Sequence, residues 1–184
     1  MRITGGKYRG RRLVCPPGEI RPAMDKMRET IFAILGNLDG CSFLDLFAGS
    51  GSMAIEAAGR GASRVTLVER DKSKRKVLTQ NLEIVEEPTQ VFFLPVERFV
   101  AGAREEYDYI FVDAPFPYRH RADLLGRIVA SRLVGPDTVV MFHYPAEDPM
   151  PENAGQVERT DLRIFGRSLV AFYRHCSKET ELLL

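Results

Sequence analysis

The sequence predicts a doubly wound α/β fold built on a mostly parallel sheet. Short apolar runs alternate with helix-like segments along most of the 184 residues. The apolar runs are continuous, as in parallel strands that are covered on both faces. A glycine-rich turn also joins the first run to the helix that follows it, as in Rossmann-like proteins. A chain of this length is sufficient for one domain with its own core.

The individual elements follow from the same patterns. Pro22 is placed to open a first helix, whose apolar stripe runs from Met24 to Leu38. Strands are then expected at 42–47, 64–69, 90–94, 107–113 and 138–144. Helices are expected between them at 51–61, 72–85, 97–104 and 120–133. Two further strand-like runs meet at Gly166 and predict a C-terminal hairpin, which would form an antiparallel edge.

The charge is distributed unevenly. Residues 1–28 carry eight Lys and Arg against Glu19 and Asp25, a net charge of +6, so the remaining chain has −5. We expect residues 1–21 to form a small basic extension, a loose hairpin, on a main domain at 22–184. A basic end on an acidic domain favours contact with a polyanion, and a solvated arm is the alternative.

Composition also argues against several classes of protein. Cys15, Cys41 and Cys176 are odd in number and far apart, which fits a reducing compartment and shows no metal-ligand spacing. No apolar run approaches the roughly 18 residues of a membrane span. The basic N-terminus has no apolar segment behind it, unlike a signal peptide. We therefore expect a cytoplasmic protein, a monomer, with no membrane contact and no metal.

The stretch DLFAGSGSMA at 45–54 carries the strongest local signal. Gly49 and Gly51 allow a tight turn at a helix N-terminus, where a ligand can approach the backbone. Glu69 ends the next strand, where an acid accepts hydrogen bonds from ribose hydroxyls, so a nicotinamide dinucleotide is one candidate. Asp45 favours a different ligand, because its charge would oppose a pyrophosphate. The ammonium and sulfonium of S-adenosylmethionine suit this carboxylate.

Asp113 is a third acid at the carboxyl end of a predicted strand, where ligands collect in open α/β sheets. An exocyclic amine of a nucleobase is a poor nucleophile. The Asp113 carboxylate and the carbonyl of Ala114 can accept its protons and stabilise the positive charge that develops. Phe116 is placed to stack on a flipped base. A turn aspartate followed by a core phenylalanine is the alternative, but the glycine loop favours the catalytic interpretation.

With these motifs the chain resembles a known family, the bacterial RsmD-type 16S rRNA (guanine-N2)-methyltransferases. The resemblance covers nearly the whole chain and rests on RITGGKYRGRRL, RPAMDKMRETIF, FLDLFAGSGSMAIEAAGRGA, VTLVERD and YDYIFVDAPF. It implies the class I methyltransferase fold and S-adenosylmethionine as cofactor. It also implies a single guanine of 16S rRNA as target, within a small-subunit ribosomal particle.

The resemblance and the residue chemistry together predict three groups of site residues. The predicted cofactor site comprises Asp45, Phe47, Gly49, Ser50, Gly51, Glu69, Arg70, Val96 and Asp113. The predicted site for the target amine comprises Asp113, Ala114, Pro115 and Phe116. The residues predicted to contact rRNA phosphates are Lys7, Arg9, Arg11, Arg12, Lys26 and Arg28.

The sequence departs from the family pattern at three places. Ala23 and Met24 replace two hydroxyl residues that are usual before the Asp of the first helix. Pro95 stands where an Asn or Asp is usual near the adenine, which leaves the N–H of Val96 and apolar packing to hold that ring. Ala114 replaces the first proline of the Asp-Pro-Pro-Phe/Tyr motif.

The change at Ala114 removes a fixed φ and adds one N–H. Because Pro115 follows, residue 114 stays out of the α region, and we expect an extended, active loop with the Ala114 carbonyl directed at the donor methyl. Two alternatives to the guanine-N2 hypothesis remain. One is an N6-adenine nucleic-acid methyltransferase, and the other is a non-catalytic rRNA-binding assembly factor in which Ala114 is the lesion.

Overall fold

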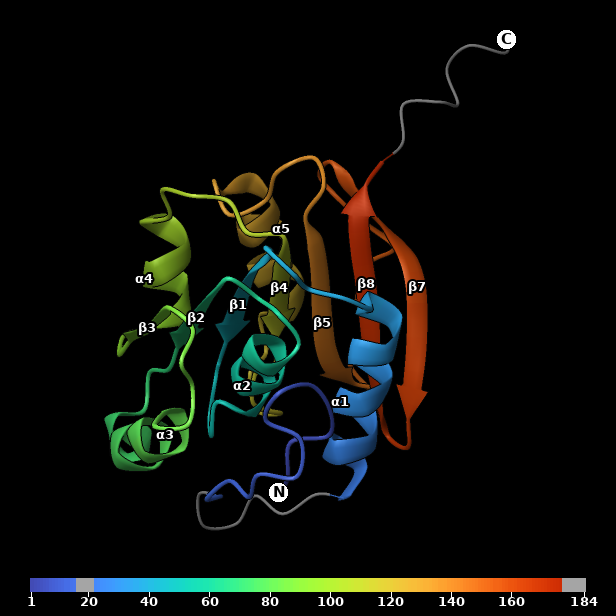
Figure 1. Ribbon diagram of the computed structural model, residues 1–184. Coiled ribbons are helices and arrows are strands. Elements are labelled where there is room, and N and C mark those ends of the chain that lie inside the picture. The colour runs from blue at the N-terminus through green and yellow to red at the C-terminus, as the bar shows by residue number, and fades with distance from the viewer. Residues whose placement is uncertain (16–21, 177–184) are drawn as a thin grey trace, which may run out of the picture.

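The computed structural model in Figure 1 describes residues 1–15 and 22–176. Its helices are α1 (Pro22–Leu35), α2 (Ser52–Gly59), the 3-10 turn η1 (Lys72–Lys74), α3 (Arg75–Leu82), α4 (Val96–Ala101) and α5 (Arg121–Ala130). Its strands are β1 (Ser42–Leu46), β2 (Arg64–Val68), β3 (Thr89–Phe92), β4 (Tyr109–Val112), β5 (Val139–Pro145), β6 (Asn153–Ala154), β7 (Val157–Phe165) and β8 (Ser168–His175). The predicted alternation of strands and helices is therefore confirmed.

The strands form one sheet in the order β3-β2-β1-β4-β5-β8-β7-β6. Strands β1 to β5 pair in parallel. The C-terminal hairpin of β7 and β8 joins the edge of β5 in antiparallel pairing, as predicted. Gly166, with φ of 62°, takes a left-handed conformation in the hairpin turn. The short strand β6 was not predicted, because two residues leave no periodic signal.

Helices cover both faces of this sheet, so its parallel strands are buried on both sides (Figure 1). One apolar layer packs under α1, α2 and α3 and includes Ile31, Phe32, Phe43, Leu67, Leu78 and Phe111. The other packs under α4 and α5 and includes Leu46, Val100, Ile110, Val112, Leu124 and Phe142. Successive strand residues alternate between the two layers, as the pleat requires.

Several predicted elements are shorter in the structure, mostly at their C-terminal ends. The helix predicted at 72–85 begins with η1, where the Asp71 carboxylate accepts the Ser73 N–H at 2.9 Å. The strand predicted at 107–113 is limited to β4. Asp108, just before it, bonds the N–H and the hydroxyl of Ser42 with its side chain.

The N-terminal segment, residues 1–15, packs on the sheet domain. Arg2 and Arg12 form an antiparallel bridge, which agrees with the predicted loose hairpin. Ile3, Tyr8 and Leu13 are buried in the same apolar layer as α1, α2 and α3. The expected boundary at residue 21 lies outside the described residues. Across the described ranges no helix is long and apolar enough to cross a membrane.

Candidate active site

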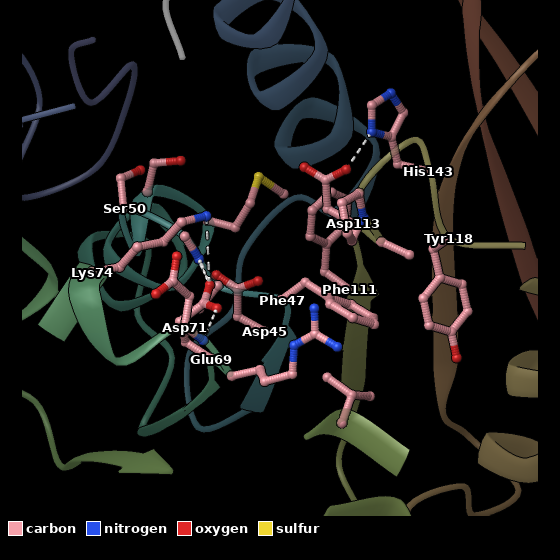
Figure 2. Close-up of a pocket in the computed structure, with 18 of the residues that line it drawn as sticks. Asp45, Phe47, Ser50, Glu69, Asp71, Lys74, Phe111, Asp113, Tyr118 and His143 are labelled. Atoms are coloured by element: carbon pink, nitrogen blue, oxygen red, sulfur yellow. Dashed lines mark hydrogen bonds and ion pairs between the residues drawn. The ribbon is translucent and has the colours of Figure 1, made fainter. Parts of the chain in front are cut away.

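One cavity of about 470 Å³ opens at the carboxyl ends of the parallel strands. It gathers residues from the loops after β1, β2 and β4, from α4 and from β5 (Figure 2). Of the predicted cofactor and target residues, the lining includes Asp45, Phe47, Gly49, Ser50, Glu69, Arg70, Val96, Asp113, Ala114, Pro115 and Phe116. The structure therefore brings the predicted cofactor residues and the predicted target-amine residues, which lie far apart in the sequence, into one cavity.

Strand register places the acids of this cavity on one face. Asp45 is paired with Phe111 across β1 and β4, and Asp113 lies two residues beyond Phe111. Glu69 directly follows β2, whose last residue Val68 packs in the opposite layer. All three carboxylates consequently point to the side covered by α1, α2 and α3.

Asp45 carries the most unusual electrostatic environment. It is 2% exposed, and its Oδ2 has no hydrogen-bond partner among the described residues. Burial, together with the nearby carboxylate of Asp113, raises the pKa of Asp45 well above its usual range, although the N–H of Ala54 at α2 opposes this. A buried carboxylate of this kind is satisfied when a cation enters the cavity.

Glu69 is held in place by the loops around it. Its Oε2 accepts the Gly49 N–H at 2.9 Å, and its Oε1 accepts the Asp71 N–H at 2.8 Å. The Lys74 ammonium lies 4.0 Å from Oε2. These bonds fix the carboxylate at the rim where the glycine loop and the exit of β2 meet. Two lone pairs remain for a ligand with vicinal hydroxyls.

Three residues of the glycine loop adopt left-handed conformations, Phe47, Gly49 and Gly51. Gly51 has φ of 79° and is the predicted residue that does not line the cavity. A Cβ there would lie 2.7 Å from Leu78 Cδ1, so its role is to let the loop close over α3. Phe47 has φ of 66°, which is unusual for a residue with a bulky side chain. No sequence signal predicts this strain, which is typical of ligand sites.

The loop after β4 is anchored from both sides. The Asp113 N–H donates to the Leu46 carbonyl at 3.2 Å, and Asp113 Oδ1 lies 2.7 Å from His143 Nδ1. The buried Arg121 donates to the carbonyls of Pro115 and Phe116, each at 2.9 Å. The Ala114 carbonyl accepts no hydrogen bond from the described residues. Its predicted direction toward a donor methyl stays a prediction.

A match over residues 1–174 to the family model described as Conserved hypothetical protein 95 decides the family. The chain belongs to this family. The RsmD-type resemblance is confirmed as well, because several curated relatives are named "Ribosomal RNA small subunit methyltransferase D".

Two curated relatives and one solved structure illustrate the similarity. A Bacillus subtilis protein named "Putative rRNA methyltransferase YlbH" is 33% identical over 95% of this chain and 98% of its own length. The Escherichia coli "Ribosomal RNA small subunit methyltransferase D" is 38% identical over 63% of this chain and 60% of its own. A structure titled "Putative methyltransferase yhhF from Escherichia coli" matches with TM-score 0.84 and 25% identity, covering 95% and 97% of the two chains.

These similarities confirm the fold class and the class of cofactor. The chain has the class I methyltransferase fold, whose methyltransferases use S-adenosylmethionine. The cavity fits that cofactor, because Asp45 offers a buried, unpartnered carboxylate oxygen and Glu69 lies on the neighbouring strand's exit, two residues beyond the Leu67 that pairs with Asp45. Among the residues described, no three His, Cys, Asp or Glu side chains gather as a metal ion would require.

The structure overturns one predicted RNA contact, that of Arg28. Its side chain is 1% exposed and donates to Glu56 at 3.2 Å and to Asp25 at 3.0 Å. It also donates to the Arg2 carbonyl. Arg28 follows Met24 by four residues, so it belongs to the buried face of α1 and cannot contact phosphate. The four-residue spacing from Met24 is the sequence signal that indicates the burial of Arg28.

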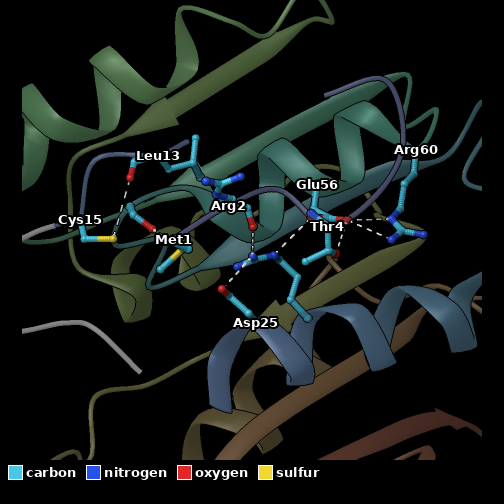
Figure 3. Close-up of polar contacts among 10 residues, drawn as sticks. Met1, Arg2, Thr4, Leu13, Cys15, Asp25, Glu56 and Arg60 are labelled. Carbon is cyan, nitrogen blue, oxygen red and sulfur yellow. Dashed lines mark hydrogen bonds and ion pairs between the residues drawn. The ribbon is translucent and has the colours of Figure 1, made fainter. Parts of the chain in front are cut away.

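Glu56, the partner of Arg28, is the centre of a buried network. It is fully buried, accepts the Thr4 N–H at 2.8 Å and the Thr4 hydroxyl at 2.7 Å, and pairs with Arg60 at 2.9 Å. One carboxylate thus ties the N-terminal segment, α1 and α2 together (Figure 3). The network positions the basic N-terminal segment beside the cavity, and Met1 lines that cavity.

The other predicted basic residues lie at the surface. Arg9, Arg11, Arg12 and Lys26 are exposed. Lys7 pairs with Glu86 at 2.7 Å and with Glu87 at 3.2 Å, so part of its charge is compensated within the protein. RNA contact by these five residues stays a prediction.

Asn81 links the N-terminal segment to the glycine loop. It is 4% exposed, accepts the Val14 N–H at 2.8 Å, and donates to the carbonyls of Val14 and Ser50, each at 2.9 Å. Asn81→Leu leaves these three backbone groups without their partner. We expect the free energy of unfolding to fall by about 1–3 kcal/mol, measured by urea denaturation.

Gln80→Leu is the matched control for Asn81→Leu, because Gln80 is exposed on the same helix. Its free energy of unfolding should stay close to wild type. Equal stability of the two variants would show that Asn81 does not hold the segment to the loop.

Proposed function

We propose that this protein transfers a methyl group from S-adenosylmethionine to the exocyclic N2 of one guanine in 16S rRNA, at the position-966 type of site. One observation carries the proposal. Three carboxylates with different surroundings, Asp45, Glu69 and Asp113, meet on one face of a single cavity. The membership of the chain in its family supports the rRNA substrate, because relatives named as small-subunit rRNA methyltransferases match it.

The cofactor part of the cavity divides its work between two acids. S-adenosylmethionine, when bound, supplies an electrophilic methyl group on a sulfonium. Asp45 would hold the ammonium end, and this positive charge would oppose the burial that raises the pKa of the carboxylate. Glu69 accepts hydrogen bonds from the ribose hydroxyls. Val96, the first residue of α4, presents an N–H without an intrahelical acceptor to the adenine edge.

The target part of the cavity prepares the guanine amine. Phe116 is 42% exposed at the cavity rim and stacks on the flipped base. Asp113 and the carbonyl of Ala114 accept hydrogen bonds from the two amine N–H groups, which turns the nitrogen lone pair toward the methyl group. The negative carboxylate also stabilises the positive charge that forms on nitrogen during transfer.

The methylation map of 16S rRNA tests the proposed function. Small-subunit particles from a strain that lacks the protein would be incubated with the purified protein and labelled S-adenosylmethionine, and the modified nucleotide identified by mass spectrometry. We expect one N2-methylguanine. An N6-methyladenine would establish the second enzyme hypothesis, and incorporation of no label would leave the non-catalytic assembly factor.

The exposed arginines of the N-terminal segment should determine how tightly the particle is held. In the triple variant Arg9→Ser, Arg11→Ser, Arg12→Ser, we expect weaker particle binding and a shallower dependence of log K on log salt. The slope should fall by about 2–3, since each lost phosphate contact removes roughly 0.7–0.9. Filter binding at several salt concentrations measures it.

Arg104→Ser with Arg132→Ser is the control, because both exposed side chains precede parallel strands and so lie at the opposite edge of the sheet. This control should keep the wild-type salt slope. If the triple variant keeps it too, the N-terminal segment does not contact phosphate.

A further inference from the structure

His143 on β5 is a buried polar residue of the cavity that the proposed chemistry has not used. It lines the cavity and is 3% exposed. Parallel pairing aligns Val112 of β4 with Phe142 of β5, so the next residue of each strand, Asp113 and His143, lie side by side. The sheet register itself therefore places an imidazole beside the carboxylate that receives the target amine (Figure 2).

The hydrogen bond between the pair fixes which imidazole nitrogen carries the proton. His143 Nδ1 lies 2.7 Å from Asp113 Oδ1. The other nitrogen, Nε2, is buried and has no partner among the described residues. An N–H at Nε2 would be left unsatisfied, which costs free energy, whereas an N–H at Nδ1 is satisfied by the carboxylate. The surroundings thus favour the neutral tautomer that donates from Nδ1.

A neutral donor suits this position better than a cation. Asp113 must keep its negative charge to stabilise the cationic amine, and an arginine or lysine partner would compensate that charge. The carboxylate of Asp113 also repels that of Asp45 in the same cavity. Without a hydrogen-bond donor on one oxygen, the Asp113 carboxylate is free to rotate away from Asp45 and toward solvent. The side chain of Asp113 is 26% exposed.

We propose that His143 is a positioning residue that holds Asp113 Oδ1 so that Oδ2 faces the target amine. The inference rests on the proposed function, in which Asp113 accepts an amine proton. Among the described residues Oδ2 has no hydrogen-bond partner, so it is available to the substrate. Phe116 completes the arrangement, because its ring lies 6.2 Å from the imidazole and so flanks the same carboxylate.

A series of substitutions at His143 separates positioning from packing. Asn carries its amide N–H close to the place of Nδ1, Gln carries it nearer to Nε2, and Leu has no donor. We expect His143→Leu and His143→Gln to slow single-turnover methyl transfer on the order of 10- to 100-fold, as a displaced reacting group does. His143→Asn should restore most of the rate. KM for the particle and Kd for S-adenosylmethionine should stay near wild type.

The double variant Asp113→Ala with His143→Leu decides whether His143 acts through Asp113. If it does, the double variant is no slower than Asp113→Ala alone, because the bond that His143 supplies is already lost. Multiplied rate losses would overturn the proposal, as would a wild-type rate in His143→Leu. His175→Leu is the control, since His175 ends β8 at the edge away from the cavity (Figure 1).

A measurement without RNA keeps this inference separate from the proposed function. The nitrogen-15 NMR shifts of the imidazole in wild-type protein at pH 8 should report a proton on Nδ1, and Asp113→Ala should abolish that preference. A proton on Nε2 would overturn the proposal. If wild-type protein transfers no methyl group to any particle, the proposed function fails, and the NMR result still decides the role of the pair.

Discussion

Asp113→Ala should nearly abolish methyl transfer while the protein still binds its cofactor. The variant removes one of two acceptors for the amine protons and the charge that stabilises the cationic nitrogen. Losing one such preorganised group slows an enzyme on the order of 100- to 1,000-fold. Single-turnover transfer to small-subunit particles measures the rate, and calorimetry with S-adenosylmethionine measures binding.

The affinity for the cofactor should be largely kept in Asp113→Ala, because Asp45 and Glu69 are untouched. Asp137→Ala is the matched control, since Asp137 is exposed and precedes β5 at the opposite edge of the sheet. It should transfer methyl groups at the wild-type rate. Normal turnover in Asp113→Ala would remove this residue from the mechanism.

Asp45→Asn should weaken cofactor binding and at the same time stabilise the protein without cofactor. Removing the charged partner of the methionine ammonium in a desolvated site costs about 2–5 kcal/mol of binding free energy. That corresponds to a loss of affinity on the order of 30-fold or more. Because Asn keeps the shape of Asp and can still accept the Ala54 N–H, the loop should stay folded.

The stability effect of Asp45→Asn depends on pH. The folded state raises the pKa of Asp45, so the wild-type protein binds this proton more tightly when folded than when unfolded. Its stability therefore falls as pH rises from the ordinary Asp pKa, about 4, through the raised value. Asp45→Asn has no titrating carboxyl at this position, so its stability does not fall in this way. We expect it to gain about 0.5–2 kcal/mol at neutral pH, as removal of a functional strain does.

Thermal unfolding between pH 4 and pH 8 without cofactor tests this dependence. The difference between Asp45→Asn and wild type should grow as pH increases. A stability difference that does not change with pH would show that the charge on Asp45 is not the cause of that difference. With S-adenosylmethionine added, the wild type should become the more stable of the two proteins. Ligand binding stabilises the wild type by mass action and stabilises the variant far less.

The sequence predicted the acids of the site well, because each one ends a strand. Asp45, Glu69 and Asp113 follow continuous apolar runs, and parallel strands bring their carboxyl ends to one edge. The two strand-like runs that meet at Gly166 also predicted the C-terminal hairpin at the antiparallel edge. These are properties of local pattern combined with a known topology.

Other features required coordinates. His143 is a single polar residue inside the apolar run VVMFHYP. Nothing in that run indicates that the pairing of β4 and β5 aligns it with Asp113. The positive φ of Phe47 has no sequence signature, because glycine is the residue expected there. The partner of Arg28, Glu56, lies 28 positions away, and no local pattern in the sequence pairs these two residues.

The contacts of the N-terminal segment have a consequence for how the chain folds during synthesis. Thr4 bonds Glu56, Val14 bonds Asn81, and Tyr8 donates its hydroxyl to Glu87 at 2.6 Å. The segment leaves the ribosome before its partners, which are made up to about 80 residues later. Domains generally fold as units during synthesis. This basic segment therefore stays without its partners until α3 and the turn after it have emerged.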